Sequence, residues 1–295
     1  MRRIFLKAAN GKPKHWIIPS LVGEALSGGV EQTIPAMAAI ACLHISIILI
    51  DDMLDNDPRG EQFNIGLPMT ANLATAFQAL GFEVIHRSEL APHSKLVVLE
   101  SLNAMVRKTA FGQYLDGSNS IDESTYWQII QLKSSPFFGA ALQVGGLFGG
   151  ASIEVSEQLK QLGCLYGECI QMHDDLNDSL AVPANSDWLL NRAPLPILFA
   201  QVVKHPDRER FLALRREIKD LKNLTEAQTI LVRCGAVSYC LDRILAKQKE
   251  AISLLKTIPL TNKAILEKLF AELIIPVQGL LNTVNSTQPL SPLSL

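Results

Sequence analysis

The chain has 295 residues, of which 48% are hydrophobic and 19% charged, so it is too apolar for a disordered protein and can bury a sizeable core. Lysine and arginine number 27 against 29 aspartates and glutamates, and a net charge of -2 excludes a global field for holding nucleic acid or an anionic membrane surface. Five cysteines without a CxxC pair indicate reduced thiols and therefore a cytoplasmic protein.

Helical periodicity predicts an all-α fold, a single-domain bundle of about nine or ten helices around a central cavity. Apolar side chains recur at helical spacing, as at Leu96, Leu99 and Leu102. The predicted helices span residues 32–55, 68–88, 93–116, 121–148, 154–181, 187–204, 206–221, 225–256 and 262–283. The domain is expected to cover residues 1–284, and the polar segment 285–295 to form a loose tail.

Two stretches are apolar enough to resemble membrane spans, residues 32–50 and 134–153. The first runs directly into two aspartates, and the second contains five glycines. Buried helices of a bundle explain both stretches better than transmembrane spans do. Capping boxes further predict helix starts at Ser120 and Thr225, each followed three residues later by Glu or Gln.

The most informative feature is the acidic cluster that closes the first long helix, with the sequence Asp-Asp-Met-Leu-Asp at residues 51–55. Asp51 and Asp55 are four residues apart, so their carboxylates share one helical face and repel each other. The helix dipole adds to this cost, because the C-terminal end of a helix favours cations. A positively charged partner is therefore expected.

A second cluster, Asp-Asp-Leu-Asn-Asp at residues 174–178, repeats this arrangement at the end of another apolar helix. Two copies with one spacing are poorly explained as solvated acidic helix ends. Carboxylates without nearby cysteines, and with His173 as the only adjacent imidazole, suit Mg²⁺, or Mn²⁺ in its place, and not zinc. Because Mg²⁺ in proteins usually also binds phosphate oxygens, the clusters predict a phosphorylated substrate, most simply a diphosphate.

These residues resemble the two aspartate-rich motifs of trans-isoprenyl diphosphate synthases, the polyprenyl synthetase family with the class I isoprenoid synthase fold. Further matches follow in the family's order across nearly the whole chain. They are Gly11-Lys12-Pro13-Lys14-His15-Trp16 for GKxxRP, His44 seven residues before the first motif, Gly112-Gln113 with Asp116 for GQxxD, Lys133-Ser134 for the K(T/S) pair, Gln171 before the second motif, and Asn191-Arg192-Ala193-Pro194-Leu195-Pro196 for GKxTLP.

The resemblance implies a Mg²⁺-dependent prenyltransferase that ionises an allylic isoprenyl diphosphate and couples it to isopentenyl diphosphate. It further implies three bound Mg²⁺ ions and a homodimer. Carried over residue by residue, it assigns catalysis to Asp51, Asp52, Asp55, Asp174, Asp175 and Lys133. It assigns metal binding to Asp51, Asp55, Asp174 and Asp178, and diphosphate binding to Lys12, His15, Arg59, Lys133, Gln171 and Arg192.

The resemblance also places a prenyl tunnel beside the first helix, lined by Ser46, Ile47 and Gln113. Ser46 and Ile47 occupy the positions five and four residues before the first motif, where family members with short products tend to carry aromatic side chains. No Phe, Tyr or Trp lies between Trp16 and Phe63. A product of about fifteen to twenty carbons or longer is therefore expected.

The departures from the family pattern leave alternatives open. His15 replaces the arginine of GKxxRP, and the arginine pair after the first motif shrinks to Arg59. A histidine is mostly neutral at pH 7, so isopentenyl diphosphate would be held less tightly. Prenyl transfer to another acceptor and terpene-synthase-like cyclisation therefore remain possible, although Asp178 and Val182 do not match the cyclase form of the second motif. A non-catalytic subunit of a hetero-oligomeric synthase is the alternative of another class.

Overall fold

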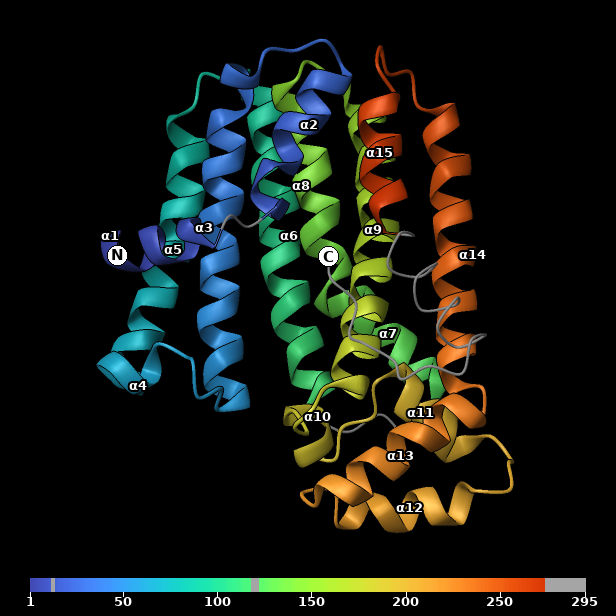
Figure 1. Cartoon of the computed structure of the whole chain (residues 1–295). Coiled ribbons are helices and arrows are strands. Elements are labelled where there is room, and N and C mark those ends of the chain that lie inside the picture. Colours follow the sequence, from blue (N-terminus) through green and yellow to red (C-terminus); the bar gives the residue numbers. More distant parts are fainter. Residues whose placement is uncertain (12–13, 118–121, 274–295) are drawn as a thin grey trace. The chain divides into compact units, whose positions relative to one another are not determined.

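The computed structural model describes residues 1–11, 14–117 and 122–273, and every regular element within these ranges is a helix (Figure 1). The predicted all-α fold is thus confirmed. The elements up to the middle of the chain are α1 Arg2–Asn10, the 3₁₀ helix η1 Lys14–Ile17, α2 Ile18–Ala25, α3 Val30–Asp55, α4 Gln62–Ile65, α5 Leu67–Arg87, α6 Pro92–Asp116, α7 Glu123–Lys133 and α8 Ser135–Phe148. They are followed by α9 Ile153–Leu180, α10 Ser186–Leu189, α11 Leu195–Val202, α12 Arg208–Arg216, α13 Leu221–Arg233, α14 Ala236–Thr257 and α15 Ala264–Glu272.

The chain forms two compact units, each assembled from segments that are distant in sequence. Unit 1 comprises residues 1–109, 136–164 and 254–267, and unit 2 comprises residues 110–135, 165–253 and the chain from residue 268 onward. The predicted domain end at residue 284 and the predicted tail 285–295 lie outside the described residues.

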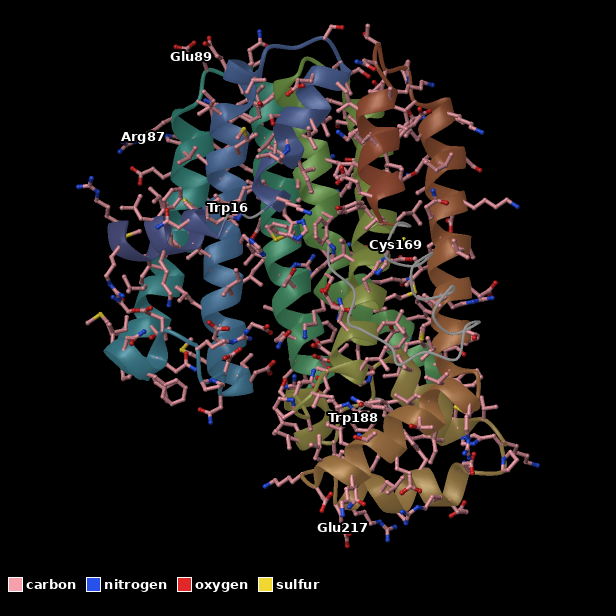
Figure 2. All side chains as sticks on the ribbon, viewed as in Figure 1. Trp16, Arg87, Glu89, Cys169, Trp188 and Glu217 are labelled. Carbon is pink, nitrogen blue, oxygen red and sulfur yellow. The ribbon has the colours of Figure 1, made fainter. Side chains whose placement is uncertain are left out.

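Unit 1 is organised around α3, which runs beside α5 (Figure 1). The two helices approach closely at Gly81, where an added Cβ would lie 2.9 Å from Cγ of Leu43. Trp16 of η1 is buried in the same core, together with Phe77 of α5 and Ile45 of α3 (Figure 2). Because α3 is packed in the core, it can be apolar around most of its circumference and needs no separate polar face.

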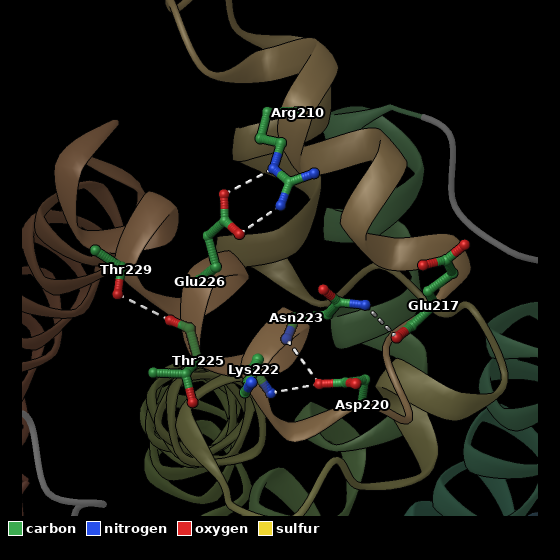
Figure 3. Close-up of polar contacts among 8 residues, drawn as sticks. All are labelled: Arg210, Glu217, Asp220, Lys222, Asn223, Thr225, Glu226 and Thr229. Atoms are coloured by element: carbon green, nitrogen blue, oxygen red, sulfur yellow. Dashed lines mark hydrogen bonds and ion pairs between the residues drawn. The ribbon is translucent and has the colours of Figure 1, made fainter.

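Unit 2 has its core around Trp188, which is buried and packs on Phe211 at a ring distance of 6.1 Å (Figure 2). Helices α12 and α13 are joined by an ion pair in which Nε and Nη2 of Arg210 donate to Glu226 at 2.7 and 2.5 Å (Figure 3). Asp220 caps α13 by accepting from the backbone N–H of Lys222 at 2.7 Å. The surface of α12 and α13 thus carries polar contacts, while the interior of unit 2 around Trp188 is apolar.

Several predicted helix boundaries are wrong. The predicted helix 121–148 is divided at Ser134, and the predicted helix 187–204 is interrupted between α10 and α11. Thr225 lies inside α13, where its hydroxyl donates to the carbonyl of Leu221, because Asp220 already provides the cap five residues earlier. Asp122 caps α7, whereas Ser120 lies outside the described residues. Helices α1 and α2 were not predicted.

Helix α3 is long and apolar enough to cross a bilayer by length and composition, with a mean hydropathy of 2.2 in its most apolar window. However, 56% of that window is buried inside the protein, as befits a core helix. Helix α8, which contains most of the second apolar stretch, has only 14 residues, too few for a span.

Gly145 of α8 tests the close packing within unit 1. A Cβ at this position would lie 2.6 Å from Cα of Pro19 in α2, so Gly145→Ala forces the two backbones apart. The substitution is expected to lower the free energy of unfolding by about 1–3 kcal/mol, measured by urea denaturation. Gly29→Ala is the control, since nothing lies within 4 Å of its Cβ position. Equal stability of the two variants would contradict the close approach.

Candidate functional site: two acidic helix ends

The first acidic cluster closes α3 in unit 1. The helix stops because Asn56 adopts a left-handed conformation with φ of 52°. Nε2 of Gln62 secures the turn by donating to the carbonyl oxygens of Asp52 and Asp57 at 2.8 and 3.2 Å. Burial, and then the carboxylates of Asp57 and Asp51, raise the pKa of Asp52 to about 6. Neighbouring carboxylates thus add to the effect of burial on the pKa of Asp52.

Arg59, a predicted diphosphate ligand, lies just beyond the first cluster. Its Nε and Nη2 donate to the carboxylate of Asp57 at 3.1 and 2.7 Å, and its side chain is 88% exposed. The hydrogen bond from Arg59 holds the pKa of Asp57 below its usual value. To bind a diphosphate, Arg59 would have to share these donors with Asp57.

A further pair of cations, missed from the sequence, comes from α1. Arg3 and Lys7 both form ion pairs with Glu61, whose side chain is only 4% exposed. Lys7 also acts on Asp52, whose pKa it lowers slightly against the larger effects of burial and neighbouring aspartates. The available signal was the spacing of the two basic residues, four apart and so on one helical face.

The second acidic cluster lies in the last two turns of α9, within unit 2. The side chain of Asp174 keeps access to solvent although protein atoms surround its carboxyl group, and that of Asp178 is partly buried. Loss of surrounding water, followed by the carboxylates of Asp175 and Asp178, raises the pKa of Asp174 to about 7. Lys133 offsets only part of this effect. Neighbouring negative charge thus adds to the effect of burial at Asp174.

Asp175 differs from its neighbours because it is buried and fully engaged. Its Oδ2 accepts from the hydroxyl of Tyr126 at 2.6 Å and from the backbone N–H of Leu195 at 3.2 Å, and its Oδ1 accepts from Nε2 of Gln171 at 2.9 Å. The amide oxygen of Gln171 accepts in turn from the hydroxyl of Ser134. Asp175 thus joins α7, α9 and α11.

Lys133 lies at the end of α7 and pairs with Asp116 of α6 at 2.7 Å. Gly112 makes this approach possible, since a Cβ there would lie 2.5 Å from the backbone nitrogen of Lys133. Gln113, predicted to line the tunnel, is the next residue of α6 and is partly buried.

Arg192 lies in the loop between α10 and α11 and is 12% exposed. Its Nη1 lies 3.7 Å from Oδ1 of Asp187, and its backbone N–H donates to the carbonyl of Asp187 at 2.8 Å. Burial, and then Asp175 and Asp178, raise the pKa of Asp187 to about 7. Asp187 is a further carboxylate near the second cluster that the sequence analysis missed.

His15 and His44, the two histidines at positions of family motifs, lie among aromatic side chains in unit 1. His44 accepts at Nδ1 from Nε1 of Trp16 at 2.9 Å and stacks on Phe137 at 4.8 Å. His15 meets Phe138 edge-on at 4.9 Å, and its buried Nδ1 has no hydrogen-bond partner within the described part of the chain. Burial lowers the pKa of both, that of His44 to about 4. Both rings are therefore neutral at pH 7.

The predicted tunnel residues of α3 are close to these rings in sequence. Ser46 is buried and Ile47 is partly buried. Helix α3 itself carries no aromatic side chain except that of His44, yet Phe137 of α8 packs on it. The aromatic side chain beside α3 therefore belongs to α8, a neighbour that the sequence alone did not predict. Lys12, a predicted diphosphate ligand, lies outside the described residues.

The predicted site residues divide between the two units. Unit 1 contains Asp51, Asp52, Asp55, Arg59, His15, Ser46 and Ile47, and unit 2 contains Asp174, Asp175, Asp178, Lys133, Gln171, Arg192 and Gln113. Unit 2 brings Lys133, Gln171 and Asp175 into one network with the second cluster.

The donor set fits a hard divalent cation. Both clusters offer carboxylate oxygens, and a cation would favour the charged forms of Asp52 and Asp174, whose pKa values are raised by burial and by neighbouring carboxylates. Among residues 1–11, 14–117 and 122–273, no three acidic, histidine or cysteine side chains are grouped so that they could hold an ion by themselves. Such a cation would complete its shell with water and substrate oxygens, as Mg²⁺ usually does.

The neutral state of His44 gives a pH prediction. In the unfolded chain its pKa is 6.5, against about 4 in the fold, so the unfolded state takes up the proton first and stability falls between pH 6.5 and 4. His44→Gln keeps an acceptor for Trp16 without titrating. Between pH 7 and 5 the variant should lose about 2 kcal/mol less unfolding free energy than the wild type, by urea denaturation. Parallel losses in the two proteins would contradict the buried neutral histidine.

Comparisons with known proteins agree with this geometry. The family model described as polyprenyl synthetase matches residues 6–231. The geranylgeranyl diphosphate synthase of Methanosarcina mazei is 30% identical over 190 residues, which cover 60% of this chain and 57% of that enzyme. The short chain isoprenyl diphosphate synthase of Methanothermobacter thermautotrophicus is 28% identical over 249 residues, 79% of this chain and 76% of that protein.

Solved structures share the fold. The geranylgeranyl pyrophosphate synthetase of Pyrococcus horikoshii superposes with a TM-score of 0.81 at 23% identity, covering 93% of this chain and 90% of that one. The polyprenyl synthase of Caulobacter crescentus, solved in complex with calcium and isoprenyl diphosphate, has a TM-score of 0.77 at 21% identity, covering 88% and 83%. With its acidic helix ends and a family match over most of its length, the chain belongs to the polyprenyl synthetase family.

Proposed function

We propose that the protein is a Mg²⁺-dependent prenyltransferase that ionises an allylic isoprenyl diphosphate and couples it to isopentenyl diphosphate. The product is an isoprenyl diphosphate of about fifteen to twenty carbons or longer, an expectation drawn from the family resemblance. Membership of the polyprenyl synthetase family supports the reaction class. Relatives named as geranylgeranyl and geranylfarnesyl diphosphate synthases support the product range.

The observation that carries the proposal is the group of carboxylates in the second cluster, which lies in the same unit as two basic side chains. Asp174 is exposed with a raised pKa, while Lys133 and Arg192 lie in the same unit. Carboxylates alone repel a diphosphate, so a divalent cation has to mediate between them. The two basic side chains can then bind the diphosphate directly.

The proposed roles follow from this charge arrangement. In unit 1, Asp51 and Asp55 would hold Mg²⁺, and in unit 2 Asp174 would do so with support from Asp178. The family resemblance implies three ions. A bound ion would supply charge that stabilises the departing diphosphate. Heterolysis of the allylic carbon–oxygen bond leaves its electron pair on the diphosphate, where Lys133 and Arg192 offset the developing charge.

The other residues position the reacting groups. Asp175 holds the start of α11 and the hydroxyl of Tyr126 in place through its hydrogen bonds. The double bond of isopentenyl diphosphate attacks the allylic cation and forms the new carbon–carbon bond, and the adduct then loses a proton to the released diphosphate. Apolar packing around α3 excludes water, which would otherwise capture the cation.

Prenyl transfer to a different acceptor is the second candidate function, and one observation favours it. His15 stands at the arginine position of the GKxxRP segment, but it is partly buried against Phe138 and neutral at pH 7. A neutral ring donates a hydrogen bond to a diphosphate without offsetting its charge. An uncharged acceptor would not need the positive charge of an arginine at this position, so the neutral His15 fits such an acceptor.

The homodimer and the cytoplasmic location are further proposals. Sedimentation equilibrium of the purified chain should give about twice the mass of 32.4 kDa if the dimer is correct. A monomer at micromolar concentration would rule it out. The cytoplasmic location rests on the reduced cysteines expected from the sequence.

The reaction is tested by incubating the protein with geranyl, farnesyl or geranylgeranyl diphosphate, with and without isopentenyl diphosphate, in the presence of Mg²⁺. Elongation adds five-carbon units to the product mass, and a chelator should stop it. Release of diphosphate without isopentenyl-dependent elongation would favour the second candidate. No metal-dependent product from any of the three substrates would refute the enzyme.

The roles of the acidic clusters are tested by Asp51→Ala and Asp174→Ala. Each should lower kcat/KM by at least about 100-fold, because each removes a carboxylate that holds the metal. Asp242→Ala is the control, since Asp242 is 65% exposed and pairs with Arg243 on α14. Circular dichroism should show unchanged helicity in all three variants. Rates near wild type in both cluster variants would remove the proposed mechanism.

A further inference from the structure

The loop that carries Arg192 is fixed from several sides within unit 2. Arg192 is linked to Asp187 through both its backbone N–H and its guanidinium. Nε1 of Trp188 donates to the carbonyl of Ser179 at 3.2 Å, and Nε2 of Gln228 donates to the same oxygen at 3.2 Å. These bonds tie α10, which precedes the loop, to the end of α9, and tie that end of α9 to α13.

Arg215 of α12 adds a contact of a different kind. Its side chain is buried, and its Nη2 donates to the backbone carbonyl of Arg192 at 2.7 Å. Its Cζ lies 5.9 Å from the centre of the Trp188 ring, a cation–π distance. Asp187 acts electrostatically on the same guanidinium. Arg215 thus contacts the loop at the residue predicted to bind diphosphate.

A buried arginine is costly unless its charge and donors are used. Burial lowers the pKa of Arg215 to about 10, so it still carries its charge at pH 7. Its Nε has no hydrogen-bond partner within the described part of the chain, and the carbonyl of Arg192 is the acceptor recorded for Nη2. An apolar side chain would fill the same space beside Trp188 at lower cost.

The backbone next to Arg192 explains why such a contact matters. Asn191 has φ of 60°, a left-handed conformation that asparagine adopts more readily than most other non-glycine residues and that turns the chain just before Arg192. A hydrogen bond to the carbonyl of Arg192 restrains the peptide plane that follows. The direction of the Arg192 side chain depends on these two peptide planes.

We propose that Arg215 is a positioning residue for Arg192: from α12 it fixes the backbone carbonyl of Arg192 and so orients the guanidinium that binds the substrate diphosphate. The inference rests on the proposed function for the role of Arg192. It assigns to α12, a helix outside the acidic clusters, a part in diphosphate binding. A purely structural role, in which Arg215 only supports Trp188 in the core, is the alternative to exclude.

A double-mutant cycle distinguishes the two roles. Arg215→Met, Arg192→Met and the double variant are titrated with inorganic diphosphate in the presence of Mg²⁺ by calorimetry, using the full chain. Arg215→Met should weaken diphosphate binding about 10-fold, and should add less than about 2-fold when Arg192 is already Met. KM for farnesyl diphosphate should rise in parallel. Loss of the same size in both backgrounds, or no loss, overturns the proposal.

Arg208→Met is the matched control, because Arg208 also lies on α12 and its Nε donates to a backbone carbonyl, that of Gln201, at 2.6 Å. Its diphosphate affinity should equal that of the wild type. If Arg215→Met fails to fold, the cycle is run with Arg215→Lys, which keeps the charge and one donor. A loss of about 3-fold that disappears with Arg192→Met supports positioning, and an undiminished loss overturns it.

The cycle separates the two proposals. A wild-type protein that binds diphosphate and shows the non-additive cycle, but forms no prenyl product, would refute the proposed reaction and leave the positioning role intact. An active wild type with an additive cycle would refute the positioning role alone. A wild type that does not bind inorganic diphosphate with Mg²⁺ would overturn the positioning role as well.

Discussion

Two apolar helices each end in a cluster of carboxylates, and repulsion among the carboxylates within each cluster is the constraint on which the rest of the site depends. Cations of the chain act on both clusters: Lys133, which pairs with Asp116, lowers the pKa of Asp174, and Arg59, which pairs with Asp57, lowers that of Asp52. The pKa of each of these two aspartates nevertheless stays raised by burial and by neighbouring carboxylates. In the proposed function, a divalent cation bound with a diphosphate would add the further positive charge.

The neighbouring network keeps the repelling groups in place. Asp175 is held by donors from Tyr126, Gln171 and Leu195, which belong to three different helices. Breaking any one of these bonds would leave a buried polar atom unsatisfied, at a cost of about 1–3 kcal/mol. This rigidity leaves Asp174 exposed at a fixed position, which suits a group that has to meet a substrate.

Features with a local signature could be predicted from the sequence. The end of α3 lies at its predicted position and that of α9 within one residue of it, because turn-forming residues follow both helices. Tyr126 and Arg215 could not be predicted, because they meet Asp175 and Arg192 across 49 and 23 residues. The break of the predicted helix 121–148 was missed, although Pro136, two residues after Ser134, is typical of the first turn of a new helix.

The most direct test of the central claim is the melting temperature of the wild type and Asp174→Asn at pH 8, measured without metal and with Mg²⁺ plus inorganic diphosphate. Removing one repelling charge should leave the metal-free variant at least as stable as the wild type. Only the wild type should then gain several degrees from the ligands, through preferential binding to the folded state. An equal gain in both proteins, or none in the wild type, would contradict the role given to these carboxylates.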